Sequence, residues 1–308
     1  MISPISVATI GVSDLERSAR FYRHLLDWEL VAAGDVDGPD LEALWRMPAG
    51  LRGRAVVIGA PGTALGRVRL IEWAKPGEMV RDPARNQDFG HYALNFRVGD
   101  LESVWERLEE IGGSARSRPN TWVVAEGILA HDSLCYDPDR ITCDVFELPD
   151  EGPLGPLGDR PSSELQTMAI RPSDIAASVA FYQGLGYEVW YDHKTDGIEG
   201  FLHLPEGTTL HNVNFHMPRQ SRNGRVELAA YLGFPGVPTS HLAVPPNIGI
   251  MSITFESDDF DHDVSLLEKV GGFPVATSDG VEIVPYGPTR VATYLGPDGE
   301  AIELVEVG

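Results

Sequence analysis

Residues 13–22 read Ser-Asp-Leu-Glu-Arg-Ser-Ala-Arg-Phe-Tyr, and residues 173–182 repeat this pattern as Ser-Asp-Ile-Ala-Ala-Ser-Val-Ala-Phe-Tyr. In the first copy, Ser13 and Glu16 form a capping-box pattern, which starts a helix. The preceding segment, 5–12, is rich in β-branched residues and is typical of a strand. The repeat therefore predicts one strand-then-helix unit near the start of the chain and a second one after its middle.

Two more segments recur at nearly the same spacing along the chain. Leu-Glu-Glu-Ile-Gly-Gly at 108–113 returns as Leu-Glu-Lys-Val-Gly-Gly at 267–272, and Asp-Pro-Asp at 137–139 returns as Gly-Pro-Asp at 296–298. Since all three landmarks keep their order and spacing, the chain is expected to contain two similar halves.

Each half is expected to hold two modules of one strand, one helix and three strands, so the predicted fold is α+β with four βαβββ modules. The second, third and fourth modules are expected to begin near Tyr92, Leu165 and Ile248. We predict an N-terminal domain at 1–149 and a C-terminal domain at 162–308. The segment between them, 150–161, is rich in Pro and Gly and is predicted to be a linker.

The composition restricts the class of protein. The chain has 308 residues and a formal net charge of −22, which disfavours nucleic acid and anionic membranes as partners, because both attract basic surfaces. No apolar run is long enough to span a bilayer, and the N-terminus lacks the features of a signal peptide. We therefore expect a cytoplasmic protein whose two cysteines, Cys135 and Cys143, are free buried thiols.

A strand, then Ser-Asp-Leu-Glu-Arg-Ser-x-x-Phe-Tyr, then a final strand after an Asp-Pro-Asp-type turn resembles the vicinal oxygen chelate superfamily of glyoxalases, bleomycin-resistance proteins and extradiol dioxygenases. The resemblance covers nearly the whole chain. It implies that two modules pair to form a cup open on one side, giving two glyoxalase-like domains with cupped mixed sheets. These motifs specify the fold better than the reaction, because the fold hosts several chemistries.

The resemblance also implies which positions would hold a metal ion. Members with a metal usually place a His on the first strand of a module and a Glu on its last strand. The four first-strand positions hold Val7, Ala93, Thr167 and Ser252. The four last-strand positions hold Arg69, Asp144, Glu227 and Glu303. The chain keeps carboxylates but lacks every imidazole, so the cofactor is expected to be either one divalent metal ion or none.

The second half is expected to bring Glu227 and Glu303 together in one cup, as acid/base groups or as metal ligands. The hydroxyls of Thr167 and Ser252 are expected to contact substrate oxygens there. Two converging carboxylates raise the pKa of one of them, which suits proton transfer between carbon atoms.

The first half is expected to place Arg69 opposite Asp144. An Arg–Asp pair there would more often be a structural ion pair than a catalytic one, but Asp144 is kept as a catalytic candidate and Arg69 as a substrate-binding one. His91, two residues before Ala93 on the same strand face, is a further substrate-binding candidate.

Three histidines fall on the middle strands of module three: His203, His211 and His216. One of them could enter the cup beside Glu227. Their alternative role is that of polar strand residues with local partners. The spacing of His211 and His216 places them on opposite faces of one strand, which argues against a shared metal site.

Three functions remain open from the sequence. The first is an isomerase or lyase that acts on a small oxygenated metabolite by carboxylate acid/base chemistry, with or without a divalent metal. The second is a metal-free protein of the bleomycin-resistance kind that binds or sequesters a small molecule. The third is an extradiol-type dioxygenase, although only Glu303 matches the iron ligands that the resemblance implies. In each case the partner is a small molecule, and the protein is a monomer or a homodimer.

Overall fold

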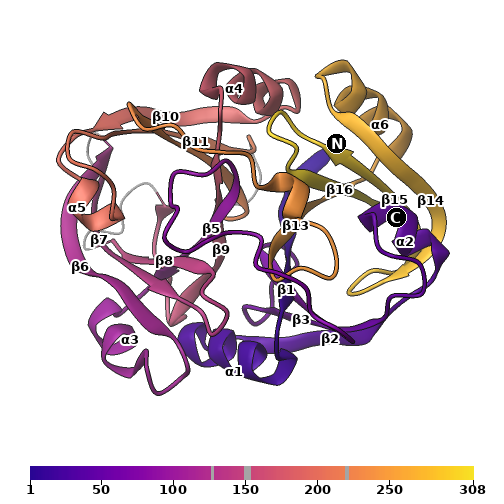
Figure 1. Cartoon of the computed structure of the whole chain (residues 1–308), viewed down its shortest axis with the longest axis horizontal. Helices are drawn as coiled ribbons and strands as arrows, with labels where there is room; N and C mark the ends of the chain where they lie inside the picture. Colours follow the sequence, from indigo (N-terminus) through magenta and orange to yellow (C-terminus); the bar gives the residue numbers. More distant parts are fainter. Residues whose placement is uncertain (126–127, 149–153, 219–221) are drawn as a thin grey trace.

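A strand, a helix and three further strands recur four times along the chain. A computed structural model describes residues 1–125, 128–148, 154–218 and 222–308, and Figure 1 shows the resulting arrangement. The recurrence confirms the predicted α+β fold of four modules. Within these ranges, no helix is both long and apolar enough to cross a membrane.

The elements of the first half have the following bounds. Module one contains β1 (Ile2–Val12), α1 (Leu15–Leu26), β2 (Glu29–Val36), α2 (Pro39–Trp45), β3 (Gly53–Gly59) and β4 (Arg67–Trp73). Module two contains β5 (Gly90–Val98), α3 (Leu101–Arg107), β6 (Ser114–Ala125), β7 (Ile128–Tyr136) and β8 (Thr142–Glu147).

The second half follows the same order. Module three contains β9 (Ser162–Arg171), α4 (Ile175–Gly184), β10 (Glu188–Thr195), α5 (Glu199–Leu202), β11 (Thr209–His216) and β12 (Arg225–Leu232). Module four contains β13 (Gly249–Ser257), α6 (Phe260–Lys269), β14 (Phe273–Ile283), β15 (Gly287–Leu295) and β16 (Ala301–Glu306).

The repeated Ser-Asp pair joins the start of a helix to the turn of the next module. Asp14, rather than the predicted Ser13, caps α1 by accepting a hydrogen bond from the Arg17 amide at 2.9 Å. Ser13 instead donates its amide to Asp139 at 2.9 Å, and Ser173 in the second copy donates its amide to Asp298 at 3.0 Å. The sequence landmarks recur together because they contact each other in both halves.

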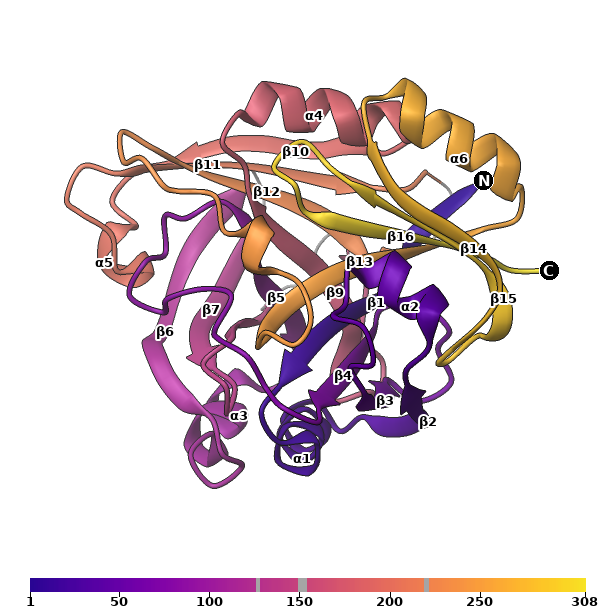
Figure 2. The ribbon, with the colours of Figure 1, turned by 45° about the vertical axis from the view of Figure 1, so that its right-hand side comes forward.

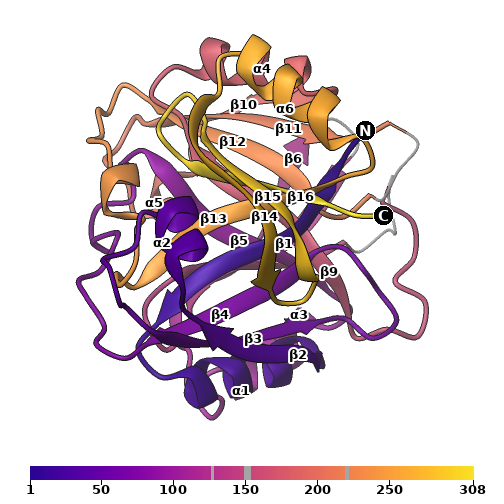
Figure 3. The same cartoon turned by 90° about the vertical axis from the view of Figure 1, so that its right-hand side faces the viewer.

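Two curved eight-stranded sheets are built across the two halves of the chain (Figures 1 and 3). One has the order β14-β15-β16-β13-β1-β4-β3-β2 and the other β10-β11-β12-β9-β5-β8-β7-β6. Module one therefore pairs with module four through antiparallel β1 and β13, and module two with module three through β5 and β9. The expectation that modules of the same half share a cup is wrong, because the strands that meet at the centre of each sheet come from different halves.

The main hydrophobic core lies on one face of each central strand. Leu94 and Phe96 of β5 are fully buried there, together with aromatic rings from α1 and α4. Since successive side chains of a strand point to opposite faces, the alternate residues Ala93 and Asn95 face the hollow of the sheet. Cys135 and Cys143, also in this core, are buried free thiols on paired strands, as predicted.

Candidate functional site

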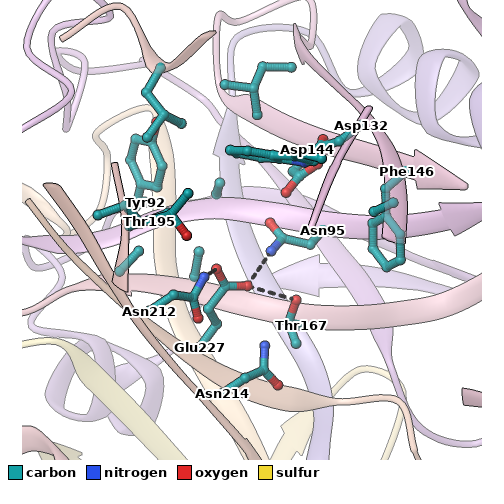
Figure 4. A pocket seen from close by; sticks show the side chains of 18 of the residues that line it. Tyr92, Asn95, Asp132, Asp144, Phe146, Thr167, Thr195, Asn212, Asn214 and Glu227 are labelled. Atoms are coloured by element: carbon teal, nitrogen blue, oxygen red, sulfur yellow. Dashed lines mark hydrogen bonds between the residues drawn. The ribbon is translucent and has the colours of Figure 1, made fainter. Parts of the chain in front are cut away.

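A cavity lies in the cup of modules two and three, and Figure 4 shows side chains of its wall. Its empty space measures about 990 Å³, including the part that opens to solvent. Its polar side chains gather on the central strands, and aromatic and aliphatic residues form most of the remaining wall. These apolar wall residues include Trp122, Leu134, Phe146, Leu148, Leu154, Trp190, Phe201, Leu202 and Leu210.

Strand alternation directs the polar residues into this cavity. On β12, Arg225 and Glu227 line the hollow, while the intervening Val226 is fully buried in the main core. On β8, Asp144 lines the hollow and Val145 belongs to the core. Each of these strands thus presents its carboxylate to the cup because the neighbouring apolar residue is required by the core.

Glu227 is held by three uncharged donors. Asn212 donates to Glu227 Oε1 at 2.6 Å, and Asn95 and Thr167 donate to Oε2 at 2.7 and 3.3 Å; Figure 4 shows the last two side chains directed at the carboxylate. Burial raises the pKa of Glu227 to about 7. This carboxyl group therefore exchanges a proton near neutral pH.

Asp132 and Asp144 form a second acidic group in the same cavity, next to Asn95 in Figure 4. A side-chain hydrogen bond joins their carboxyl groups, which requires a proton on one of them. Burial raises the pKa of Asp132 to about 6. Burial together with the charge of Asp132 raises the pKa of Asp144 well above its usual range, so Asp144 holds the shared proton. Asp132 also accepts a hydrogen bond from Trp122 Nε1 at 3.1 Å.

The cup of modules one and four is organised differently, because its polar groups neutralise each other. Arg69 and Glu303 form an ion pair at 3.1 Å, and both side chains are completely buried. Glu303 also accepts hydrogen bonds from Ser252 at 3.0 Å and Thr254 at 2.8 Å, and Arg69 donates to Thr9 at 3.0 Å. The carboxylate, the guanidinium and the hydroxyl groups of this cup thus bind one another.

A short helix packs inside this second cup. The short α2 packs against β14 and β15, inside the curve of the sheet (Figure 2), and Leu44 and Trp45 join a core cluster there with Trp73. The guanidinium of Arg69 stacks over the Trp45 ring at 5.5 Å. A cavity of about 370 Å³ remains beside these residues, which leaves far less room than the cup of modules two and three.

The structure groups three of the predicted site residues in the open cavity: Asp144, Glu227 and Thr167. Glu303, Ser252 and Arg69 belong to the filled cup. The expectation that Glu227 and Glu303 converge is therefore wrong, since β12 and β16 lie in different sheets. The predicted Arg69–Asp144 arrangement is wrong for the same reason.

His91 does not line either cup. An irregularity in the β5–β9 pairing between His91 and Ala93 places an extra residue on β5, and such a bulge changes which side chains face the cup. Tyr92 consequently lines the cavity, whereas His91 is buried against the other sheet, 3.3 Å from the Ala301 carbonyl oxygen. Burial lowers the pKa of His91 to about 4.

The histidines of module three are also absent from the described wall of the cavity. His211 pairs with Asp192 at 2.7 Å, and its neighbour Asn212 enters the cup in its place. Sequence reasoning missed Asn212, Asn95 and Asp132. Asn95 could have been found, because it lies two residues after Ala93 and so shares its strand face.

The residues of the open cavity do not fit a divalent metal ion. Both oxygens of Glu227 are occupied by neutral donors, and no histidine belongs to the described wall of the cavity. Among the residues that the structure describes, no three His, Cys, Asp or Glu side chains form a group able to hold a metal. The pair Glu227 and Glu303 is excluded as a ligand set by its separation into two sheets.

The fold and the cupped site agree with the comparisons with known proteins. Residues 5–145 match the family model described as the Glyoxalase/Bleomycin resistance protein/Dioxygenase superfamily. Glyoxalase I from Zea mays is similar over 98% of this chain and 92% of its own, with a TM-score of 0.62 and 18% identity. A putative dioxygenase from Bacillus subtilis subsp. subtilis str. 168 is similar over 99% and 85%, with a TM-score of 0.62 and 14% identity. A search of curated proteins finds no match.

These findings identify the class of protein, which consists of paired βαβββ modules around a hollow, but they do not identify its reaction. Residues 5–145 match the glyoxalase, bleomycin-resistance and dioxygenase superfamily, also called the vicinal oxygen chelate superfamily, and the whole chain has the fold of glyoxalase I. At these levels of identity the solved structures establish the fold alone, so the reaction must be argued from the cavity.

Proposed function

We propose that the protein is an isomerase or lyase that acts on a small oxygenated molecule in the cup of modules two and three, without a metal ion. The observation that carries this proposal is the set of three carboxyl groups, Asp132, Asp144 and Glu227, in one cavity with raised pKa values. Groups that hold or release protons near neutral pH are suited to general acid and base catalysis.

The two acidic groups have different roles in this proposal. Glu227, with a pKa of about 7, accepts a proton from a carbon atom next to a substrate carbonyl group. Asp144, which keeps its proton, donates it to the carbonyl oxygen, so that an enol forms without a free charge. In an isomerisation both protons then return, one of them to the neighbouring carbon atom, so the reaction needs no oxidant or reductant.

The surrounding residues position these two groups. Asn95, Asn212 and Thr167 fix the Glu227 carboxylate in the cup. Asp132 holds Asp144 by their mutual hydrogen bond and is itself fixed by the Trp122 indole. The apolar walls limit water in the cavity, which keeps the electrostatic effects on the carboxyl groups large.

The second candidate function is a binding protein of the bleomycin-resistance kind. It is favoured by the absence of imidazoles at the family's metal positions and by the aromatic wall formed by Trp122, Trp190 and Phe201. In that case the protonated carboxyl groups would donate hydrogen bonds to ligand oxygens without transferring a proton to carbon.

Proton exchange with solvent tests the proposal. The protein is incubated in D₂O with hydroxyacetone, benzylacetone or phenylpyruvate, and deuterium incorporation beside the carbonyl group is followed by ¹H NMR. We expect faster exchange than in buffer for at least one compound. We expect Glu227→Gln to reduce that rate by about a hundredfold or more, because the general base is lost.

Glu306→Gln is the matched control, because Glu306 lies on β16 in the other sheet and faces partly into solvent. It should exchange protons at the rate of the unaltered protein. Saturable binding of a compound without exchange would favour the binding protein. Exchange that survives in Glu227→Gln would contradict the assigned base.

A further inference from the structure

One buried arginine that lines the open cavity has guanidinium nitrogen atoms without a hydrogen-bond partner among the described residues. Arg225 begins β12 and lines the cavity, and only 4% of its surface is exposed. Its guanidinium lies over the Trp190 ring, 4.2 Å from the ring centre. The arginine is thus held in place by an aromatic face, which leaves the edge of its planar group available.

Two of the three nitrogen atoms of this guanidinium make no hydrogen bond to a described residue. Within the described residues, Arg225 Nε and Nη1 have no hydrogen-bond partner. Other buried arginines each keep a structural contact: Arg69 pairs with Glu303 at 3.1 Å, and Arg116 donates to Thr142 at 2.9 Å. Each of those two still leaves one nitrogen atom without a partner among the described residues. A buried cation without hydrogen bonds costs free energy, so its retention in a cavity calls for a ligand.

The nearest acidic residue along the same strand face does not satisfy Arg225. Glu227 lies two residues further on β12, about 7 Å away along the strand, and accepts its hydrogen bonds from Asn95, Asn212 and Thr167. Arg225 and Glu227 therefore line the cavity as two separate groups. Arg225 can bind an anion, and Glu227 can accept a proton.

We propose that Arg225 binds a carboxylate of the ligand, so that the substrate class is a small carboxylic acid with an apolar body. Two parallel N–H donors on the edge of a guanidinium match the two oxygens of a carboxylate. A dianion such as a phosphate monoester is disfavoured, because Asp132, Asp144 and Glu227 occupy the same cavity as this single described cation.

This inference rests on the proposed site and deepens the proposed function. A carboxylate on Arg225 would place carbon atoms a few bonds away beside Glu227, since the two residues are neighbours on one face of β12. The acid/base groups would then act on a carbon atom whose distance from the carboxylate is fixed. Phe146, Leu154 and Trp190 provide apolar surface for the rest of the molecule.

Pairs of acids and amides test the inference by binding alone. The probes are hydrocinnamate with hydrocinnamamide and hexanoate with hexanamide, titrated against the whole protein while tryptophan fluorescence is followed. Trp122 and Trp190 line the cavity, so occupancy should change their emission. We expect at least one acid to bind about tenfold more tightly than its amide.

Arg225→Met should remove this preference by weakening acid binding about tenfold while changing amide binding little. Arg225→Lys, which keeps the charge but loses the paired donors, should fall between the two. Arg290→Met changes a partly exposed arginine on β15, in the other sheet, and should behave as the unaltered protein. Thermal melting of each variant verifies that it is folded.

Equal affinity for acid and amide, failure of both acids to bind, or an unchanged preference in folded Arg225→Met would overturn the inference. Its failure differs from failure of the proposed function. An acid preference without proton exchange would leave the carboxylate site standing and remove the catalytic role of Glu227. Proton exchange that depends on Glu227 without an acid preference would do the opposite.

Discussion

Replacing Glu227 with glutamine should change how the stability of the protein depends on pH. The pKa of this carboxyl group rises from 4.5 to about 7 on folding. Below the lower value, both the folded and the unfolded chain bind the proton. Between the two values only the folded chain keeps it, so the wild-type protein loses stability as the pH rises through this window.

The size of the effect follows from the shift. A difference of one pKa unit corresponds to about 1.4 kcal/mol, so Glu227 should destabilise the folded protein by up to about 3 kcal/mol above pH 7. Glutamine has nearly the same shape and cannot ionise. Its amide is tolerable because the Oδ1 atoms of Asn95 and Asn212 have no hydrogen-bond partner among the described residues and can accept from it after an amide rotation.

Urea denaturation between pH 4 and pH 8 measures this directly. The free energy of unfolding of Glu227→Gln minus that of the wild type should grow by up to about 3 kcal/mol across the range. Glu306→Gln removes the same charge from a partly exposed side chain on the other sheet and serves as the control. If the difference in the free energy of unfolding between Glu227→Gln and the wild type changes by less than about 1 kcal/mol between pH 4 and pH 8, the raised pKa of this carboxyl group is refuted.

Two further predictions concern the filled cup. Arg69→Met leaves the completely buried Glu303 without its counter-charge and should lower the free energy of unfolding by about 3–5 kcal/mol. The double variant with Glu303→Gln should regain much of this lost stability. A loss below about 1 kcal/mol in urea denaturation would contradict the structural role of this ion pair. Leu44→Ala in α2 removes a fully buried side chain and should lower the free energy of unfolding by about 2–5 kcal/mol. The affinity of the open cavity for acids, measured by fluorescence titration, should stay that of the wild type. Weaker acid binding in this variant would show that the two cups are coupled.

The repeat made the modules predictable because it reflects contacts that each half needs. Ser13 and Ser173, which begin the two copies of the motif, donate their amides to an acidic residue of a later turn. The tyrosine that ends each motif does the same: Tyr22 donates to Asp137 at 3.0 Å and Tyr182 to Glu300 at 3.3 Å. Such local motifs are visible in one sequence since they recur together.

The partnership of the modules was not predictable in the same way. All four modules present an equivalent first strand, so nothing in the sequence decides whether β1 pairs with β5 or with β13. The structure joins β1 to β13, and this choice separates Glu227 from Glu303. The prediction from equivalent positions therefore placed Asp144, Glu227 and Thr167 correctly on the strand faces that line a cup. It was wrong about which of the predicted site residues share that cup.

Two local features also escaped the sequence. The irregularity between His91 and Ala93 reverses the alternation of β5, and bulges have no reliable signature in a single chain. Helix α2 fills one cup, although its seven residues form no periodic pattern long enough to predict that packing. These features decide which side chains line each cup and how much empty space each cup leaves.

A crystal structure of the protein with hydrocinnamate is the most direct measurement of the central claim that the cup of modules two and three is the ligand site. We expect electron density for the acid in that cup, with its carboxylate at the Arg225 guanidinium and its ring against the apolar wall. Density beside Leu44 and Trp45 in the other cup, or an acid bound only outside both sheets, would contradict the claim.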